Sequence, residues 1–332
     1  MYEDEIRASD IYGTCRLNVM QLSKKYRVSY AQNREDIILD AFFPDIENGF
    51  YVDIGANHPV SHSVTKLFYD KGWRGINVEP NIDLYSLIVK DRPKDINVNK
   101  GVGDKAGKLL FRIYHSPDNL AGLSTFSKEM VEQYTIEGGD FTKLHEDVEV
   151  DIITLKELFD EQKVDSINFL KVDVEGFEYE VLNGNDWKKY RPELICIESN
   201  HINKNWRPTL EKNAYKNVFN DGLNDYYLSE ECLYRADNFD YAKTFLLDKP
   251  VLYADYVKEI DAIQANLDRN AKEVASLSKR LQKSNLDFHE LNARYSSAMS
   301  EIADQSQELL KYDGIRNQFS ALLGSLRKKI SR

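Results

Sequence analysis

The chain has 332 residues, of which 44 are basic and 55 acidic, so its formal net charge is −11. This length predicts two domains, or one domain with an extension, and the acidity argues against a general nucleic-acid-binding protein. No apolar run approaches the roughly 18 residues that a membrane-spanning helix needs, and the acidic start has no signal-peptide pattern. The three cysteines lack C-x-x-C spacing, which indicates a reducing compartment. We therefore expect a soluble cytoplasmic protein.

After a lead-in over residues 1–28, which we expect to be helical, the segment 29–252 alternates short apolar runs with helical patterns. The β-rich runs cover residues 50–54, 75–78, 96–99, 167–172 and 194–197. Strands that alternate with helices through right-handed crossovers predict a doubly wound α/β sheet. Ligands of such sheets bind beyond the carboxyl ends of the strands. Acidic residues follow several of these ends, so we expect the site there.

The first of these strands ends in the turn Asp53-Ile-Gly55-Ala56-Asn57. A dinucleotide loop would need two further glycines, and Asp53 would repel a pyrophosphate but suits a ligand that carries an ammonium group. Glu79 ends the next strand, 24 residues after Gly55, where a carboxylate can hold both ribose hydroxyls. These features favour S-adenosylmethionine over NAD. The alternative is a turn glycine followed by a surface carboxylate.

A second acidic group follows the strand over 167–172. Asp173, Glu175 and Glu178 lie within six residues, at the start of the next helical pattern. Acidic residues cap helices and complement the helix dipole, but three carboxylates exceed what capping needs. We therefore expect Asp173 to serve the chemistry, whereas Glu175 and Glu178 fit either role.

Transfer of a methyl group to a hydroxyl is helped by a base that takes the proton. The candidates are Asp173, Glu175, His58, His62 and His201, of which His201, beyond the fifth strand, is the preferred base. No ligand spacing calls for a metal ion, so the predicted site contains none.

The composition changes at residues 252–256, after which no proline occurs. Stepping by sevens from Ile260 gives eight positions that are all apolar or aromatic, and five of the eight positions three residues further on are also apolar. This phase predicts a coiled coil over 256–313, roughly 80 Å long, that joins copies into a dimer or trimer. The alternative is a long helix that folds back onto the globular domain.

The last segment, 314–332, contains basic but no acidic residues. Its apolar residues fall on one helical face, a pattern typical of a helix that lies on an anionic membrane surface. Four of these residues, Phe319, Leu323, Leu326 and Ile330, also continue the heptad phase, so an extension of the coiled coil is the alternative.

Several segments in order resemble the FkbM family of methyltransferases over about residues 29–250. The matching stretches begin at Ser29-Tyr-Ala-Gln-Asn33 and Gly49-Phe-Tyr-Val-Asp53-Ile-Gly55-Ala56-Asn57-His-Pro59, and continue with Ser63-Val-Thr65, Gly72-Trp-Arg-Gly-Ile-Asn-Val-Glu79-Pro80-Asn81, Phe169-Leu-Lys171-Val-Asp173-Val-Glu175-Gly176 and Asp221-Gly-Leu-Asn224. The resemblance implies a class I methyltransferase fold, a Rossmann-like sheet of seven strands. It also implies S-adenosylmethionine as cofactor and O-methylation of a sugar or natural product.

The resemblance assigns roles to individual residues. The turn from Asp53 to Asn57 holds the methionine side of the cofactor, and Glu79 holds the ribose. Gly103 and Asp104 lie beside the adenine, and Asp173 lies where the methyl group meets the acceptor. Two residues within the matching stretches, Ser63 and Pro80, are expected to be further cofactor contacts.

These observations lead to a functional hypothesis. The chain is expected to methylate a glycan or glycolipid of the bacterial surface, to cap the growing chain beside a glycosyltransferase, and to lie at the inner face of the cell membrane. Aromatic residues over 206–227 either stack on the sugar or belong to the core. The rival hypotheses are a scaffold whose methyltransferase-like domain binds a nucleoside or a partner, and an NAD-dependent sugar oxidoreductase.

Overall fold

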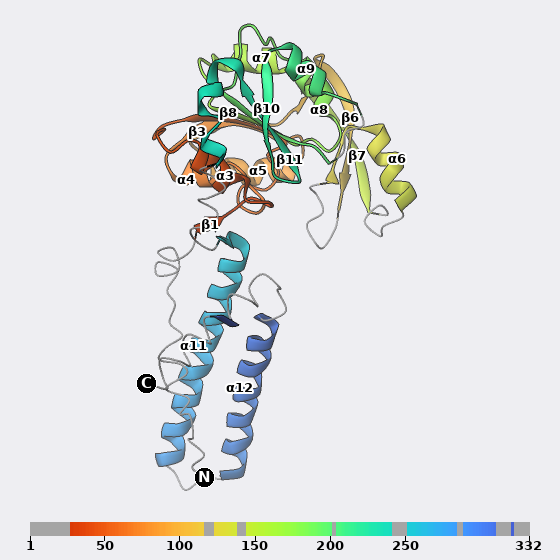
Figure 1. Cartoon of the computed structure of the whole chain (residues 1–332). Helices are drawn as coiled ribbons and strands as arrows, with labels where there is room; N and C mark the ends of the chain where they lie inside the picture. The colour runs from red at the N-terminus through yellow and green to blue at the C-terminus, as the bar shows by residue number, and fades with distance from the viewer. Residues whose placement is uncertain are drawn as a thin grey trace. The chain divides into compact units, whose positions relative to one another are not determined.

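The computed structural model describes residues 27–115, 123–137, 144–200, 204–240, 251–283, 288–309 and 320–321. The chain divides into two compact units, one of residues 29–249 and one of residues 1–28 together with 250–332. Figure 1 shows the sheet and the flanking helices of the first unit and the paired helices of the second. None of the described helices is long and apolar enough to cross a membrane.

A seven-stranded sheet forms the centre of the larger unit. In spatial order the strands are β10 (Tyr215–Asn220), β11 (Asn224–Ser229), β9 (Leu194–Glu198), β8 (Phe169–Val172), β2 (Phe50–Ile54), β3 (Arg74–Val78) and β4 (Ile96–Val98). The strands from β9 to β4 pair in parallel, whereas β11 is antiparallel to both of its neighbours. This sheet confirms the Rossmann-like fold of class I methyltransferases, and the five runs that predict strands all lie in it.

Alternate side chains of the central strands pack into two separate layers. Val52 and Ile54 of β2 pack with α7 (Leu155–Gln162), α8 (Glu178–Asn183) and α9 (Arg207–Lys212). Tyr51 of the same strand packs with α3 (Glu35–Phe42) and α4 (Lys66–Asp70). Helix α5 (Ile82–Asp91) connects β3 to β4. Both faces of the sheet are therefore covered, which explains why its strands read as continuous apolar runs.

The segment between β4 and α7 forms a smaller sheet that the sequence pattern does not predict. Its strands are β5 (Gly101–Val102), β6 (Gly107–Tyr114) and β7 (His145–Ile153), in the order β5-β7-β6, and α6 (Lys128–Glu137) lies between β6 and β7 in the chain. The first half of β6 and most of β7 are exposed. Exposed strands of this kind lack the buried apolar run that marks the strands of the main sheet. A short 3₁₀ helix, η3 (Glu230–Arg235), follows β11.

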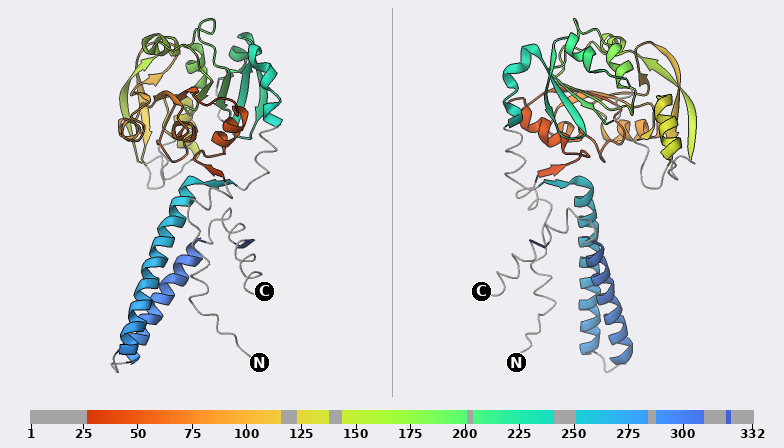
Figure 2. Two further views of the ribbon diagram at one scale, coloured as in Figure 1. Left: turned by 90° about the vertical axis from the view of Figure 1, so that its left-hand side faces the viewer. Right: turned by 45° about the vertical axis from the view of Figure 1, so that its right-hand side comes forward.

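The smaller unit contains a helix pair in place of the single continuous coiled coil expected over 256–313. Strands β1 (Arg27–Ser29) and β12 (Val251–Tyr253) form a two-stranded sheet, and α11 (Ala254–Lys283) packs against α12 (Phe288–Leu309) within one chain. Figure 2 shows these two helices side by side. Ala298 and Ile302 of the apolar seam are buried, whereas Leu267 and Val274 of the same seam are half-buried. Most of the expected helical lead-in and of the basic tail falls outside the described residues.

Candidate functional site

A cavity of about 320 Å³ opens at the carboxyl ends of four parallel strands, β3, β2, β8 and β9. Gly55, Glu79, Asp173 and Glu198 each lie at one of these strand ends and line the cavity. Because the strands are adjacent in the order β9-β8-β2-β3, Glu79 lies toward one end of the cavity and Glu198 toward the other. The site therefore has two distinct ends joined by one continuous space.

The turn after β2 is fixed by its contacts with both neighbouring strands. The backbone N–H groups of Gly55 and Ala56 donate to the carbonyl of Val78 at 3.0 and 3.1 Å. Gly55 has a φ of 79°, and a Cβ there would lie 1.9 Å from the carbonyl oxygen of Asp173, so no other residue fits without displacing the end of β8. Gly55 and Asn57 line the cavity, whereas Ala56 is buried behind them.

Glu79 closes one end of the cavity with a buried carboxylate. Its Oε2 accepts a hydrogen bond from the backbone N–H of Asn57, and its Oε1 accepts one from Asn81, both at 2.8 Å. Burial raises the pKa of Glu79 to about 7, although these two donors act to lower it. Pro80 lines the cavity beside Glu79.

Two other predicted cofactor contacts lie behind the cavity wall. Asp53 is 1% exposed, and its Oδ2 accepts from the hydroxyl of Thr65 at 2.8 Å. The hydroxyl of Ser63 accepts from the guanidinium of the buried Arg92, which also donates to Thr65. Asp53 and Ser63 are not among the residues that line the cavity. They stabilise the loop that carries Asn57, which is a supporting role.

The segment after β4 lines the cavity, but the residues that do so precede the two that the sequence predicts. Lys100, Gly101 and Val102 line it, whereas Gly103 and Asp104 are not among the lining residues. The N–H of Gly103 instead donates to the carbonyl of Ile153 at 3.1 Å, which ties the segment to β7.

Lys171 connects the end of β8 to the turn after β2 through a buried charge. Its Nζ lies 3.2 Å from Oδ2 of Asp173 and 3.6 Å from Oδ1 of Asp53, and it donates to the carbonyl of Gly55 at 3.1 Å. Burial acts to lower the pKa of Lys171, but the charges of Asp173 and Asp53 outweigh it and hold the pKa above its ordinary value. The lysine is therefore charged and fixes the end of β8 against the turn after β2.

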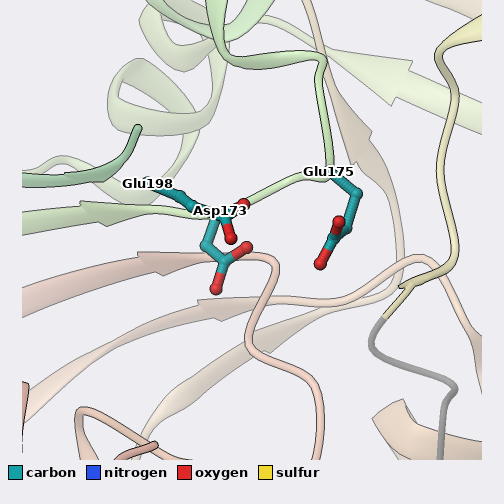
Figure 3. Close-up of side chains that lie close together, drawn as sticks. All are labelled: Asp173, Glu175 and Glu198. Atoms are coloured by element: carbon teal, nitrogen blue, oxygen red, sulfur yellow. The ribbon is translucent and has the colours of Figure 1, made fainter. Parts of the chain in front are cut away.

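The opposite end of the cavity carries three carboxylates, from Asp173, Glu175 and Glu198 (Figure 3). One oxygen from each lies within 4.8 Å of the others. Burial, followed by the charge of Asp173, raises the pKa of Glu175 to about 8 and that of Glu198 to about 11. The cluster consequently retains protons at neutral pH. A set of carboxylate oxygens at this spacing also suits a divalent cation, and the expected absence of a metal stays a prediction.

The remaining candidates are placed as follows. Glu178 accepts from the backbone N–H groups of Val174 and Gly176 at 3.2 and 3.1 Å, so it holds the loop between β8 and α8 in place. His62 lines the cavity, and His201 lies outside the described residues. Glu198 is not among the site residues expected from the sequence, although an acidic residue at the end of a strand is a signal that the sequence contains.

The aromatic residues over 206–227 belong to the core. Trp206, Tyr215, Tyr226 and Tyr227 are each at most 1% exposed, and none of them is among the lining residues of the cavity. Of the two roles left open for these aromatic residues, the structure therefore favours the core over stacking on a sugar.

A model of the methyltransferase FkbM domain matches residues 53–235, more than half of the chain. A methyltransferase FkbM from Methylobacillus flagellatus KT is similar, with 13% identity, a TM-score of 0.35, and 64% of this chain and 50% of that chain covered, so the likeness spans half of its length. TrmK of M. capricolum, solved with S-adenosyl-homocysteine, is similar with 14% identity, a TM-score of 0.29, and 84% and 97% covered. The comparison with curated proteins gives no match.

Proposed function

Since the chain belongs to the FkbM methyltransferase family, we propose that it transfers a methyl group from S-adenosylmethionine to a sugar hydroxyl of a bacterial surface glycan. The observation that carries this proposal is the single cavity with Glu79 at one end and the cluster of Asp173, Glu175 and Glu198 at the other. One end offers groups that suit a nucleoside, and the other offers acceptors for the proton of a hydroxyl.

The residues at the Glu79 end fit S-adenosylmethionine. Each carboxylate oxygen of Glu79 accepts one backbone hydrogen bond and can accept another, which suits the two hydroxyls of a ribose. Val102 and Leu84 line the same part of the cavity and provide the apolar surface that a purine requires. When bound, S-adenosylmethionine supplies the methyl group from its sulfonium.

The residues at the other end would orient the acceptor and remove its proton. In-line transfer depends strongly on position, and a carboxylate within hydrogen-bond reach of the hydroxyl provides general-base assistance. Asp173 and Glu175 both line the cavity. The pKa of Glu175 is raised to about 8, which is nearer to neutral pH than the pKa of an ordinary glutamate. General-base catalysis is most effective when the pKa of the base lies near the working pH.

The wider role rests on the smaller unit and the basic tail. The helices of residues 256–313 assemble copies of the chain, and the tail over 314–332 contacts the inner face of the membrane. The enzyme then caps a growing glycan in the cytoplasm beside a glycosyltransferase. The apolar and basic pattern of the tail supports the membrane contact.

Calorimetric titration of S-adenosylhomocysteine into the full chain tests the cofactor site. We expect Glu79→Ala to weaken binding at least tenfold, because the carboxylate bonds to ribose are lost. Asp83→Ala, an exposed carboxylate on the next helix, is the matched control and should bind like the wild type. Equal affinity of Glu79→Ala and the wild type would contradict the assignment.

The acceptor is tested with labelled S-adenosylmethionine and glycan extracted from cells that lack the gene. Such glycan has unmethylated acceptor positions, so the wild-type protein should incorporate label into it. Glycan from cells that carry the gene is the control and should take up little. An absence of incorporation by a protein that binds S-adenosylhomocysteine would exclude this acceptor class.

A further inference from the structure

Glu175 is held in a backbone conformation that few residues other than glycine adopt. Its φ is 52°, and the next residue, Gly176, has a φ of 88°. A left-handed conformation is unfavourable for a residue with a side chain, so it persists only where the surroundings fix it. In Figure 3 Glu175 comes from the loop that follows β8, whereas Asp173 and Glu198 come from the strand ends.

Two buried hydroxyls from the smaller sheet region contact Glu175. The hydroxyl of Thr125 donates to the Glu175 carbonyl at 2.6 Å, and the hydroxyl of Tyr134 on α6 donates to Oε2 of its carboxylate at 3.0 Å. Thr125 is 1% exposed and Tyr134 is 4% exposed. One donor therefore fixes the backbone of Glu175 and the other fixes its side chain.

The ring of Tyr134 packs with Tyr114, Met130 and Leu123 in a small apolar cluster. A phenylalanine would fill this space equally well, so packing does not require the hydroxyl. A buried hydroxyl must find an acceptor, and here the acceptor is a carboxylate that lines the cavity.

We propose that Tyr134, together with Thr125, is a positioning residue that holds the carboxylate of Glu175 at the acceptor end of the cavity. The segment between β4 and α7 thereby sets the geometry of a residue in the loop that follows β8. This inference rests on the proposed function. It adds to the site two residues, Thr125 and Tyr134, that lie outside the motifs around β2, β3 and β8.

The test is a double-mutant cycle of Tyr134→Phe and Glu175→Ala in the full chain. The measured quantity is kcat for methyl incorporation into glycan from cells that lack the gene. Tyr134→Phe should lower kcat roughly tenfold, while the affinity for S-adenosylhomocysteine stays within about twofold, because Tyr134 is not among the residues that line the cavity. In a Glu175→Ala background the same change should alter kcat less than about twofold. Tyr114→Phe removes a hydroxyl from the same cluster and should leave kcat unchanged in both backgrounds.

Variants of Thr125 test the same proposal independently. Thr125→Val should lower kcat, and Thr125→Ser, which keeps the hydroxyl, should restore it. An unchanged kcat in Tyr134→Phe, or an equal loss in the Glu175→Ala background, would overturn the positioning role while leaving the proposed function intact. No incorporation by the wild type would instead overturn the proposed function and this inference with it.

Discussion

At the scale of single residues, the buried carboxylate of Glu79 makes cofactor binding depend on pH. Its pKa is raised from 4.5 to about 7, chiefly by burial, so it gains a proton as the pH falls through 7. The ionised form accepts hydroxyl hydrogen bonds more strongly than the protonated form. We expect the affinity for S-adenosylhomocysteine to fall below pH 7 by up to about tenfold per pH unit.

Calorimetry between pH 5.5 and 8 measures this dependence. Glu79→Gln cannot ionise and should bind weakly at every pH, with a flat profile. If the variant shows the same slope as the wild type, another group is responsible for the pH dependence.

An acidic residue lines the cavity only if it lies just beyond the end of its strand. The sequence pattern alone does not reveal at which residue each strand ends. Asp53 lies within β2, paired in register with Lys171 and Asn77, so its carboxylate is enclosed between neighbouring strands. Glu79 and Asp173 each follow the last residue of a strand and line the cavity. The motif therefore predicts the right loop but not which of its carboxylates faces the ligand.

At the scale of elements, the prediction succeeds where burial is complete. β2, β3, β8 and β9 are buried on both faces, and their apolar runs predict them within about two residues. The exposed strands β6 and β7 carry no such run, so the region between β4 and α7, which supplies Thr125 and Tyr134, is missed. The heptad phase correctly predicts helix over most of 256–309, but it does not distinguish a partner in another chain from one in the same chain.

The packing of α11 against α12 can be tested at one buried position. Ile302 of α12 is 8% exposed, so Ile302→Asp would bury an unpaired charge and should destabilise the helix pair by about 3–5 kcal/mol. Ala303→Asp places the same side chain at an exposed neighbouring position and should cost little. Thermal unfolding followed by circular dichroism measures both, and equal loss of helix in the two variants would contradict the packing.

The affinity of Ile302→Asp for S-adenosylhomocysteine is an internal control for this experiment. The cavity is lined entirely by residues of the larger unit, between 32 and 223. Binding should therefore be retained when the helix pair is disrupted.

At the scale of the whole molecule, the division into two units separates the chemistry from the proposed assembly. A helix pair formed within one chain can still associate with a second pair, as in a four-helix bundle. We expect the full chain to be a dimer or trimer, and a chain that lacks residues 256–332 to be a monomer. Sedimentation equilibrium distinguishes these masses, and a monomeric full chain would contradict assembly through this segment.

The same deletion tests whether the helical segment influences the product. Residues 29–249 form a compact unit, and β12 remains available to pair with β1 when the chain ends at residue 255. Methylation of short acceptors should therefore persist, because the cavity and its carboxylates are intact. The length of the surface glycan in cells should change, since capping would no longer be held at a fixed position relative to the polymerising enzyme. An unaltered distribution of glycan lengths, with methylation retained, would show that the helices do not control where the chain is capped.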